Sequence, residues 1–210
     1  MEIIPVINCH DIETARERVA KAGEFAEWVH LDVSDARFTF NKSWGDYSKW
    51  PEVENKLKLE VHLMIEEPEK EIDGWLAAGA NRIIVHLEAL NEETFSEIKK
   101  KMDEKNAELM LAINPETPAE NLRPYFGKVS EFQILAVYPG PSGQKFLPLM
   151  ADKIRFLRSE MPNATIEVDG GINEETAKIS KSAGADIATS SSYIFNNPEP
   201  KEAYETLKSI

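Results

Sequence analysis

The sequence predicts an α/β fold, a single (β/α)₈ TIM barrel that spans residues 1–210. Three observations predict it: apolar runs of strand length recur along the chain, amphipathic stretches of helical length separate them, and no linker or composition shift marks a domain boundary. The pattern gives about eight strand–helix units, which fits a compact barrel. A doubly wound open sheet is the main alternative, but the Gly-x-Gly-x-x-Gly fingerprint typical of that fold does not follow the first expected strand.

The expected strands are short apolar runs of the kind that parallel sheets bury. In chain order they are Ile3–Ile7, Trp28–Val33, Leu59–Met64, Arg82–Val85, Leu109–Ile113, Phe132–Val137, Thr165–Val168 and Asp186–Ala188. The expected helices between them are Ile12–Lys21, Glu69–Ala78, Glu92–Lys105, Lys153–Arg158 and Glu174–Ser182, with weaker signals at Tyr47–Lys56 and Ala119–Tyr125 and a last unit that ends in Pro200–Ile210.

Turn residues support these boundaries. Gly23, Gly79 and Gly184 each stand where a helix should end before the next strand. Asn91 and Asn173 are typical N-cap residues, and each is followed by two glutamates that the helix dipole favours in the first turn.

The charge balance restricts the partners of the protein. There are 24 Lys and Arg against 37 Asp and Glu, a net charge of −13, which repels nucleic acid and gives no long-range help in capturing an anionic metabolite. A phosphate must therefore be bound by local geometry.

Cysteine content and hydropathy exclude other classes. Cys9 is the one cysteine, so an intramolecular disulfide framework and a Cys-based zinc site are excluded. Residues 1–7 have no basic flank of the kind that precedes a signal sequence, and no stretch approaches the roughly 18 apolar residues that a membrane span needs. We expect a cytoplasmic protein with no membrane partner.

Polar residues interrupt three of the expected strands near their carboxyl ends, where barrels of this type carry their chemistry. His30 and Asp32 are two apart, so both point to one face of the second strand. His62 lies near the end of the third strand, and Asp169 stands at the tip of the seventh, just before a glycine turn. Two imidazoles and two carboxylates suit one divalent ion such as Zn²⁺, Fe²⁺, Mn²⁺ or Co²⁺. The alternative is four separate buried polar residues, each satisfied by hydrogen bonds.

Three further polar residues have no firm role. His86 and Glu88 repeat the spacing of two on the fourth strand, and they either support the metal ligands or fill the barrel mouth. Glu167 is a buried acid by its place in the strand pattern.

Three loops after the last strands suggest an anion site. They are Tyr138–Gln144, the pair Gly170 and Gly171, and the serines 190–192. Glycines let backbone N–H groups approach a phosphate, a short helix beginning near Ser192 would add its positive end, and this fold often binds phosphate after its last two strands. Ordinary polar loops are the alternative.

Several motifs occur together in a known order. They are His30-Leu31-Asp32-Val33, Val61-His62-Leu63-Met64, Asn114-Pro115 with Thr117-Pro118, Pro139-Gly140 with Gly143-Gln144, and Glu167-Val168-Asp169-Gly170-Gly171-Ile172-Asn173. In these motifs the chain resembles the ribulose-phosphate 3-epimerase family, from the first strand to Ile194-Phe195.

The resemblance implies a ribulose-phosphate-binding barrel that interconverts D-ribulose 5-phosphate and D-xylulose 5-phosphate with one divalent metal ion. It implies His30, Asp32, His62 and Asp169 as metal ligands, with Asp32 and Asp169 also the acid/base pair on opposite faces of C3. The residues implied in sugar and phosphate binding are Met64, Gly140, Ser142, Gly143, Gly170, Gly171, Ser191 and Ser192. Family members are often homo-oligomers, and no segment of the sequence identifies an interface.

The chain departs from the family pattern in the walls of the sugar pocket. Val6 replaces a serine, Ser34 and Leu135 replace two methionines that cap the enediolate, and the loop Tyr138–Gln144 is altered, whereas Met64 is kept. A different ketose phosphate, such as allulose 6-phosphate, and a non-catalytic sugar-phosphate-binding protein are therefore the alternatives. A related decarboxylase is disfavoured because Ser34 stands where its lysine would be.

Overall fold

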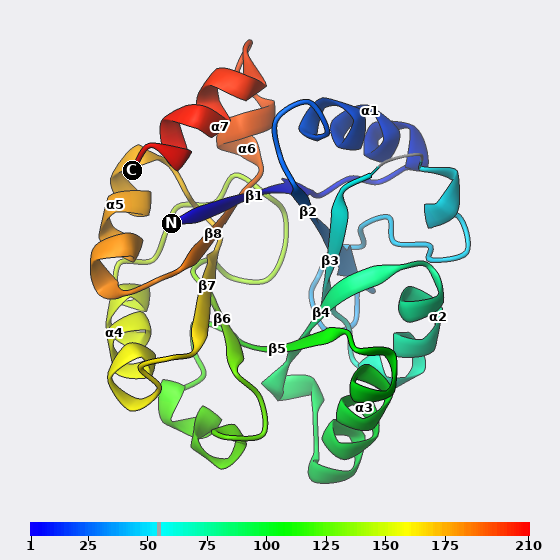
Figure 1. Ribbon diagram of the computed structural model, residues 1–210, viewed down its shortest axis with the longest axis vertical. Coiled ribbons are helices and arrows are strands. Elements are labelled where there is room, and N and C mark those ends of the chain that lie inside the picture. Colours follow the sequence, from blue (N-terminus) through cyan, green and yellow to red (C-terminus); the bar gives the residue numbers. More distant parts are fainter. Residues whose placement is uncertain (54–55) are drawn as a thin grey trace.

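The structure, a computed structural model, describes residues 1–53 and 56–210. Its parallel strands close into one barrel in the order β1 to β8, with β8 paired back to β1 (Figure 1). The strands are β1 Glu2–Ile7, β2 Trp28–Ser34, β3 Lys58–Met64, β4 Ala80–His86, β5 Glu108–Ile113, β6 Glu131–Leu135, β7 Thr165–Asp169 and β8 Ile187–Ser190. The predicted TIM barrel is confirmed.

The helices surround this barrel (Figure 1). They are α1 Ile12–Ala22, α2 Ile72–Ala77, α3 Glu92–Lys105, α4 Met150–Glu160, α5 Glu174–Ala183, α6 Ser192–Phe195 and α7 Pro200–Lys208. Short 3₁₀ segments occur at Trp50–Glu52, Pro68–Lys70, Leu87–Ala89 and Ala119–Tyr125.

The two weakest helix predictions are wrong in type. Within Tyr47–Lys56 the described residues form only the 3₁₀ turn Trp50–Glu52, and the rest of that prediction includes residues 54–55, which lie outside the described residues. Ala119–Tyr125 is a 3₁₀ segment, because Pro124 has no N–H to donate inside it. The predicted helix Glu69–Ala78 divides into the 3₁₀ turn Pro68–Lys70 and α2.

The predicted caps of α1, α3 and α5 are confirmed, although the two glycine caps differ in backbone conformation. Asn91 and Asn173 form capping boxes at the starts of α3 and α5. Gly184 ends α5 in the left-handed region, at φ 109°, whereas Gly23 ends α1 with right-handed φ of −62°. A residue with a side chain could therefore adopt the backbone of Gly23 without strain.

Strand alternation separates the two sides of the sheet. Val29, Leu31 and Val33 of β2 belong to the main apolar core between the barrel and its helices. The residues between them, His30 and Asp32, are buried on the other side, inside the barrel. Polar side chains therefore occupy much of the barrel interior.

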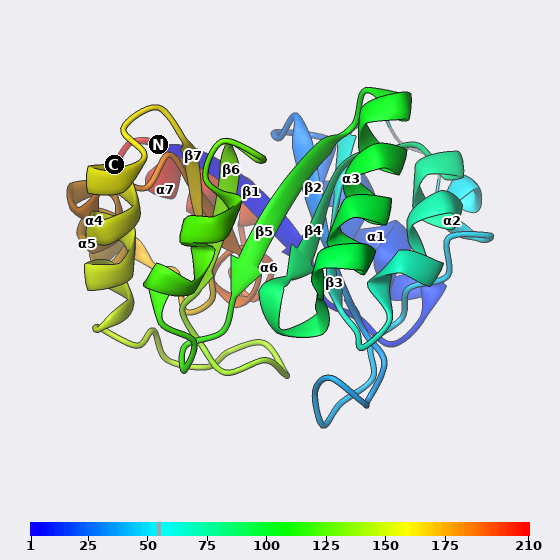
Figure 2. The same cartoon turned by 90° about the horizontal axis from the view of Figure 1, so that it is seen from below.

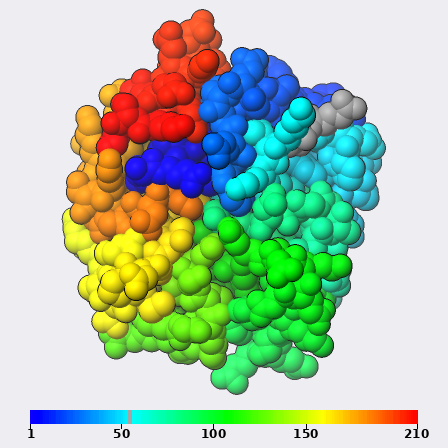
Figure 3. All heavy atoms as spheres, viewed as in Figure 1, coloured from blue at the N-terminus to red at the C-terminus, as the bar shows by residue number. Residues whose placement is uncertain are grey.

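The two ends of the barrel differ. The strands run toward the lower edge of Figure 2, where the loops after β2 and β6 extend beyond the barrel. The opposite, amino-terminal face is turned toward the viewer in Figure 3, and side chains cover it across the barrel axis. Access to the interior is therefore expected from the carboxyl-terminal end. No helix among the described residues is long and apolar enough to span a membrane, and the cytoplasmic location stays a prediction.

The cap of α3 gives a stability test remote from the barrel mouth. The side chain of Asn91 accepts hydrogen bonds from the N–H groups of Glu93 and Thr94. We expect Asn91→Ala to lower the free energy of unfolding by about 1 kcal/mol, because those N–H groups lose their acceptor. Urea denaturation measures the change, and Lys100→Ala on the exposed face of the same helix should leave it nearly unaltered. Equal effects of the two substitutions would contradict the capping role.

Candidate metal centre and anion cleft

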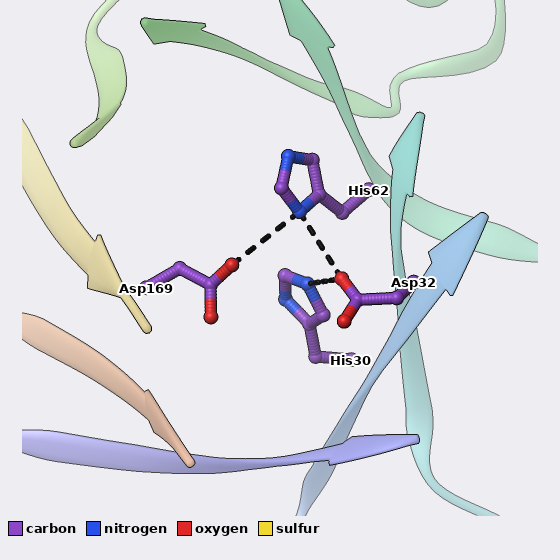
Figure 4. Close-up of side chains that lie close together, drawn as sticks. All are labelled: His30, Asp32, His62 and Asp169. Atoms are coloured by element: carbon purple, nitrogen blue, oxygen red, sulfur yellow. Dashed lines mark hydrogen bonds and ion pairs between the residues drawn. The ribbon is translucent and has the colours of Figure 1, made fainter. Parts of the chain in front are cut away.

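Four side chains from three strands converge inside the carboxyl-terminal end of the barrel (Figure 4). His30 and Asp32 come from β2, His62 from β3 and Asp169 from β7, and one ligand atom of each lies within 4.8 Å of the others. All four residues are buried. The structure therefore brings together the four residues that the sequence singled out as a cation site.

Hydrogen bonds fix the direction of the His30 ring. Its Nδ1 lies 2.6 Å from Oε1 of Glu60, and its Nε2 lies 3.1 Å from Oδ1 of Asp32. Burial favours the neutral ring, but the hydrogen bonds with Asp32 and Glu60 outweigh it and raise the pKa of His30 well above its usual value. With Nδ1–H donated to Glu60, loss of the other proton leaves a lone pair on Nε2 that faces the four-residue cluster.

A second chain of contacts supports His62. Its Nδ1 lies 3.2 Å from Oδ1 of Asp32 and 3.5 Å from Oδ2 of Asp169, and its Nε2 lies 2.7 Å from Nε2 of His86. Nδ1 of His86 lies 3.3 Å from the Glu88 carboxylate. Burial lowers the pKa of His86 to about 4, so this ring is neutral at pH 7 and accepts from Nε2–H of His62 when its own Nδ1–H points to Glu88. That order leaves Nδ1 of His62 free to face the cluster.

The two carboxylates have opposite environments. Burial raises the pKa of Asp32, but hydrogen bonds with His30 and His62 outweigh this and hold it below its usual value. Asn8 also donates to Oδ2 of Asp32 at 3.0 Å. Burial, together with the negative charge of Asp32, raises the pKa of Asp169. One ionised and one more readily protonated carboxylate therefore stand side by side.

A cleft adjoins these four residues at the barrel mouth. Its lining includes Asp32, Asp169 and every residue that the resemblance implied in sugar and phosphate binding, namely Met64, Gly140, Ser142, Gly143, Gly170, Gly171, Ser191 and Ser192. No Lys or Arg occurs among the lining residues in the described part of the chain. An anion there would depend on backbone N–H groups and hydroxyls, as the net charge of −13 led us to expect.

The altered pocket residues do not all face this cleft. Val6 and Leu135 line it beside Met64. Ser34 does not belong to the lining. Its hydroxyl accepts a hydrogen bond from the N–H of Ser43, and its own N–H donates to the Ser43 hydroxyl. These two bonds hold the loop after β2 against the end of that strand. Val6, Leu135 and Met64 therefore contribute to the apolar side of the cleft, together with Val137 and Ile172.

Three contacts of the site were not predicted from the sequence. Asn8 holds Asp32, Glu60 holds His30, and the Thr189 hydroxyl lies 2.5 Å from Oδ1 of Asp169. Glu60 had a usable signal, since it is two residues before His62 and interrupts the same apolar strand. Asn8 and Thr189 had none, because the register between adjacent strands brings them to the site.

Similarity to known proteins shows to which family the chain belongs. The model of the "Ribulose-phosphate 3 epimerase family" matches residues 2–195. The chain belongs to the ribulose-phosphate 3-epimerase family. It is 31% identical over 217 residues to the ribulose-phosphate 3-epimerase of Schizosaccharomyces pombe, covering 99% of this chain and 92% of the relative. It is 34% identical to that of Methanocaldococcus jannaschii, covering 94% and 86%. It is thus an epimerase-type isomerase of carbohydrates, like these members of the ribulose-phosphate 3-epimerase family.

Solved structures of low sequence identity share the fold. A 3-hexulose-6-phosphate synthase superposes with a TM-score of 0.76 at 16% identity and covers 100% of this chain and 99% of its own. A Streptococcus mutans protein named KGPDC, solved in complex with D-R5P, gives 0.77 at 10% identity and covers 99% and 95%. These structures share the barrel fold of this chain.

Two glycines of the cleft provide a matched pair of substitutions. Both Gly143 and Gly171 have positive φ, 88° and 68°, but a Cβ on Gly171 would lie 2.3 Å from the backbone N of Phe146, whereas a Cβ on Gly143 would meet no atom within 4 Å. We expect Gly143→Ala to cost about 1–2 kcal/mol from left-handed backbone strain. Gly171→Ala should cost about 1–3 kcal/mol more because the backbone must also move. Urea denaturation compares them, and equal losses would contradict the close approach.

Proposed function

We propose that the protein catalyses metal-dependent epimerisation at C3 of a ketose phosphate, with D-ribulose 5-phosphate converted to D-xylulose 5-phosphate as the first choice of substrate. One observation carries the proposal: two carboxylates with opposite pKa shifts meet two histidines beside a cleft suited to an anion. Family membership supports the same substrate.

The residues fit a divalent cation. His30 and His62 would be its nitrogen ligands, and Asp32 and Asp169 its oxygen ligands, a set that suits Zn²⁺, Fe²⁺, Mn²⁺ or Co²⁺. The supporting observation is the direction of the two rings, since Glu60 and His86 take up one nitrogen of each and leave the other for the ion. When bound, the ion would stabilise the negative charge that develops on the sugar oxygens at C2 and C3.

The two aspartates would exchange protons with C3. Epimerisation needs one group to remove the C3 proton from one face of the sugar and another to return a proton to the opposite face. Asp32 and Asp169 come from β2 and β7, and their opposite pKa shifts favour a single proton held by the pair. We propose that one acts as base while the other acts as acid, and that solvent exchange restores their starting states.

The phosphate would lie against the loops after β6, β7 and β8. The backbone N–H groups of Gly143, Gly170 and Gly171 and the hydroxyls of Ser191 and Ser192 are its proposed donors. The positive φ of Gly170 and Gly171, 104° and 68°, allows this tight turn after β7. Binding by neutral donors would let an acidic protein capture an anionic sugar.

Hydrogen exchange at C3 tests the reaction. We expect the protein loaded with a divalent ion to incorporate deuterium at C3 of ribulose 5-phosphate in D₂O while xylulose 5-phosphate forms, as followed by NMR. Exchange with allulose 6-phosphate in place of ribulose 5-phosphate would favour the alternative sugar. Tight binding of either sugar phosphate without exchange, under several divalent ions, would favour a non-catalytic binding protein. The homo-oligomer stays a prediction that light scattering can check in the same samples.

The acid/base pair has its own test. Asp169→Asn should slow C3 exchange by roughly 100- to 10,000-fold, because the amide can neither take up nor return the proton. Circular dichroism should show the fold retained. Asp152→Asn, an exposed position on α4, is the control and should exchange at the wild-type rate. Normal exchange by Asp169→Asn would refute the two-base assignment.

The anion cleft is tested by adding a charge. Ser191→Asp should raise KM for ribulose 5-phosphate by roughly tenfold or more, because a carboxylate beside the phosphate adds like-charge repulsion. Ser159→Asp, on the exposed face of α4, adds the same charge away from the cleft and should leave KM unchanged. Steady-state kinetics at constant ionic strength measures KM for both variants. Equal KM values would contradict the assignment of the phosphate site to the loop that contains Ser191.

A further inference from the structure

A buried ion-pair network lies beneath the metal centre, toward the amino-terminal end of the barrel. Glu60, whose Oε1 contacts His30, accepts from Nη1 of Arg82 through Oε2 at 2.6 Å. Glu60 is fully buried, and the Arg82 side chain is 7% exposed. Two hydrogen bonds of 2.6 Å each therefore connect a guanidinium at the start of β4 with a proposed metal ligand.

Arg82 is itself held on several sides. Its Nε and Nη2 lie 2.9 and 2.7 Å from the Glu108 carboxylate, and its Nε lies 3.0 Å from Glu131. Its guanidinium also lies over the Trp28 ring, 4.6 Å from the centroid. These contacts leave the planar group one orientation, with Nη1 directed at Glu60.

This network explains a second cluster of ligand-type residues. His30, Glu60 and Glu167 offer atoms within 4.8 Å of one another, which is a spacing that could suit a cation. The Arg82 guanidinium already supplies a positive charge to Glu60, and Gln133 donates to Glu167 at 2.9 Å. The lower cluster is therefore an internal ion-pair layer rather than a second metal site.

We propose that Arg82 is a positioning residue for the metal centre: it anchors Glu60, whose carboxylate holds Nδ1–H of His30 and so aims Nε2 of that ring at the barrel mouth. The inference rests on the proposed function, since it gives the aimed nitrogen an ion to bind. Arg82 acts through Glu60 and His30 and does not touch the substrate cleft, whose lining it does not join.

Stability alone is a weak reason for this pair. Burying a guanidinium and a carboxylate carries a desolvation cost that their attraction often only balances, and apolar pairs of similar volume often replace buried ion pairs without loss. Apolar side chains already fill another part of the barrel interior, at Ile84, Met110 and Ala112. Apolar residues at positions 60 and 82 could be buried in the same way. An apolar residue at position 60, however, could not accept from His30.

The test compares Zn²⁺ affinity among three single variants, measured against a chelating indicator. Glu60→Gln and Arg82→Met should each weaken Zn²⁺ binding by roughly 10- to 100-fold, the range typical of groups that orient a metal ligand. Glu108→Gln is the matched control: both contacts of Glu108 with Arg82 go to one oxygen, Oε2, which an amide oxygen can replace, so the guanidinium keeps its orientation, whereas both oxygens of Glu60 accept hydrogen bonds. Its Zn²⁺ affinity should equal that of the wild type.

Histidine NMR gives a readout that needs neither metal nor activity. The chain has four histidines, so labelling with ¹⁵N-histidine yields four rings, and His30→Gln identifies the resonance of interest. The Nδ1–H proton of His30 should be strongly downfield in the wild type and in Glu108→Gln. It should move upfield or broaden by exchange in Glu60→Gln and Arg82→Met. An unchanged His30 resonance in Arg82→Met would overturn the proposal.

A double variant separates positioning from folding. Arg82→Met alone leaves Glu60 buried without its cation, so we also use Glu60→Met with Arg82→Met, which removes both charges. It should unfold at a temperature no lower than Arg82→Met and still show the loss of Zn²⁺ affinity. Wild-type affinity in the double variant would overturn the proposal. Failure of the wild type itself to bind Zn²⁺ would contradict the proposed function instead, and the His30 resonance would still decide the role of Arg82.

Discussion

Parallel pairing between β2 and β3 is the constraint on which the site depends. In this register Asp32 is the partner of His62, and His30 is the partner of Glu60. Asp32 lines the cleft, and the pair of His30 and Glu60 lies deeper in the barrel. A slip of one residue would turn these side chains toward the helices and bring valine and leucine inside. The same register therefore creates both the ligand cluster and the support beneath it.

Burial then makes the hydrogen-bond partners decisive. Away from water, an imidazole presents a lone pair to the cleft only when its other nitrogen has a fixed acceptor. Glu60 supplies that acceptor for His30, and neutral His86 supplies it for His62. The two rings are thus oriented by different means. A carboxylate paired with Arg82 orients His30, and a second imidazole, which lies beside Glu88, orients His62.

Sequence reasoning identified the barrel, the long helices and all four residues of the cluster, because strand alternation and chain order are local signals. Asp32 and His30 needed only the spacing of two within β2. The α-helices predicted at Tyr47–Lys56 and Ala119–Tyr125 were wrong in type, because a weak amphipathic pattern does not distinguish a 3₁₀ segment from an α-helix. The approach of Asn8 to Asp32 and of Arg82 to Glu60 was not predictable, because each depends on the pairing register of two adjacent strands, which the apolar pattern does not specify.

The overall charge of −13 conceals a different balance inside the barrel. Near the floor, the positive charge of Arg82 offsets Glu60, and at the mouth the raised pKa of Asp169 favours one shared proton beside ionised Asp32. The interior thus keeps its negative charge low although the surface does not. A sugar phosphate that reaches the cleft would meet neutral N–H and hydroxyl donors, and the remaining carboxylate charge would lie on the side where a cation can bind. The depth at which each charge lies, more than the total charge, would let an acidic chain present an anion site.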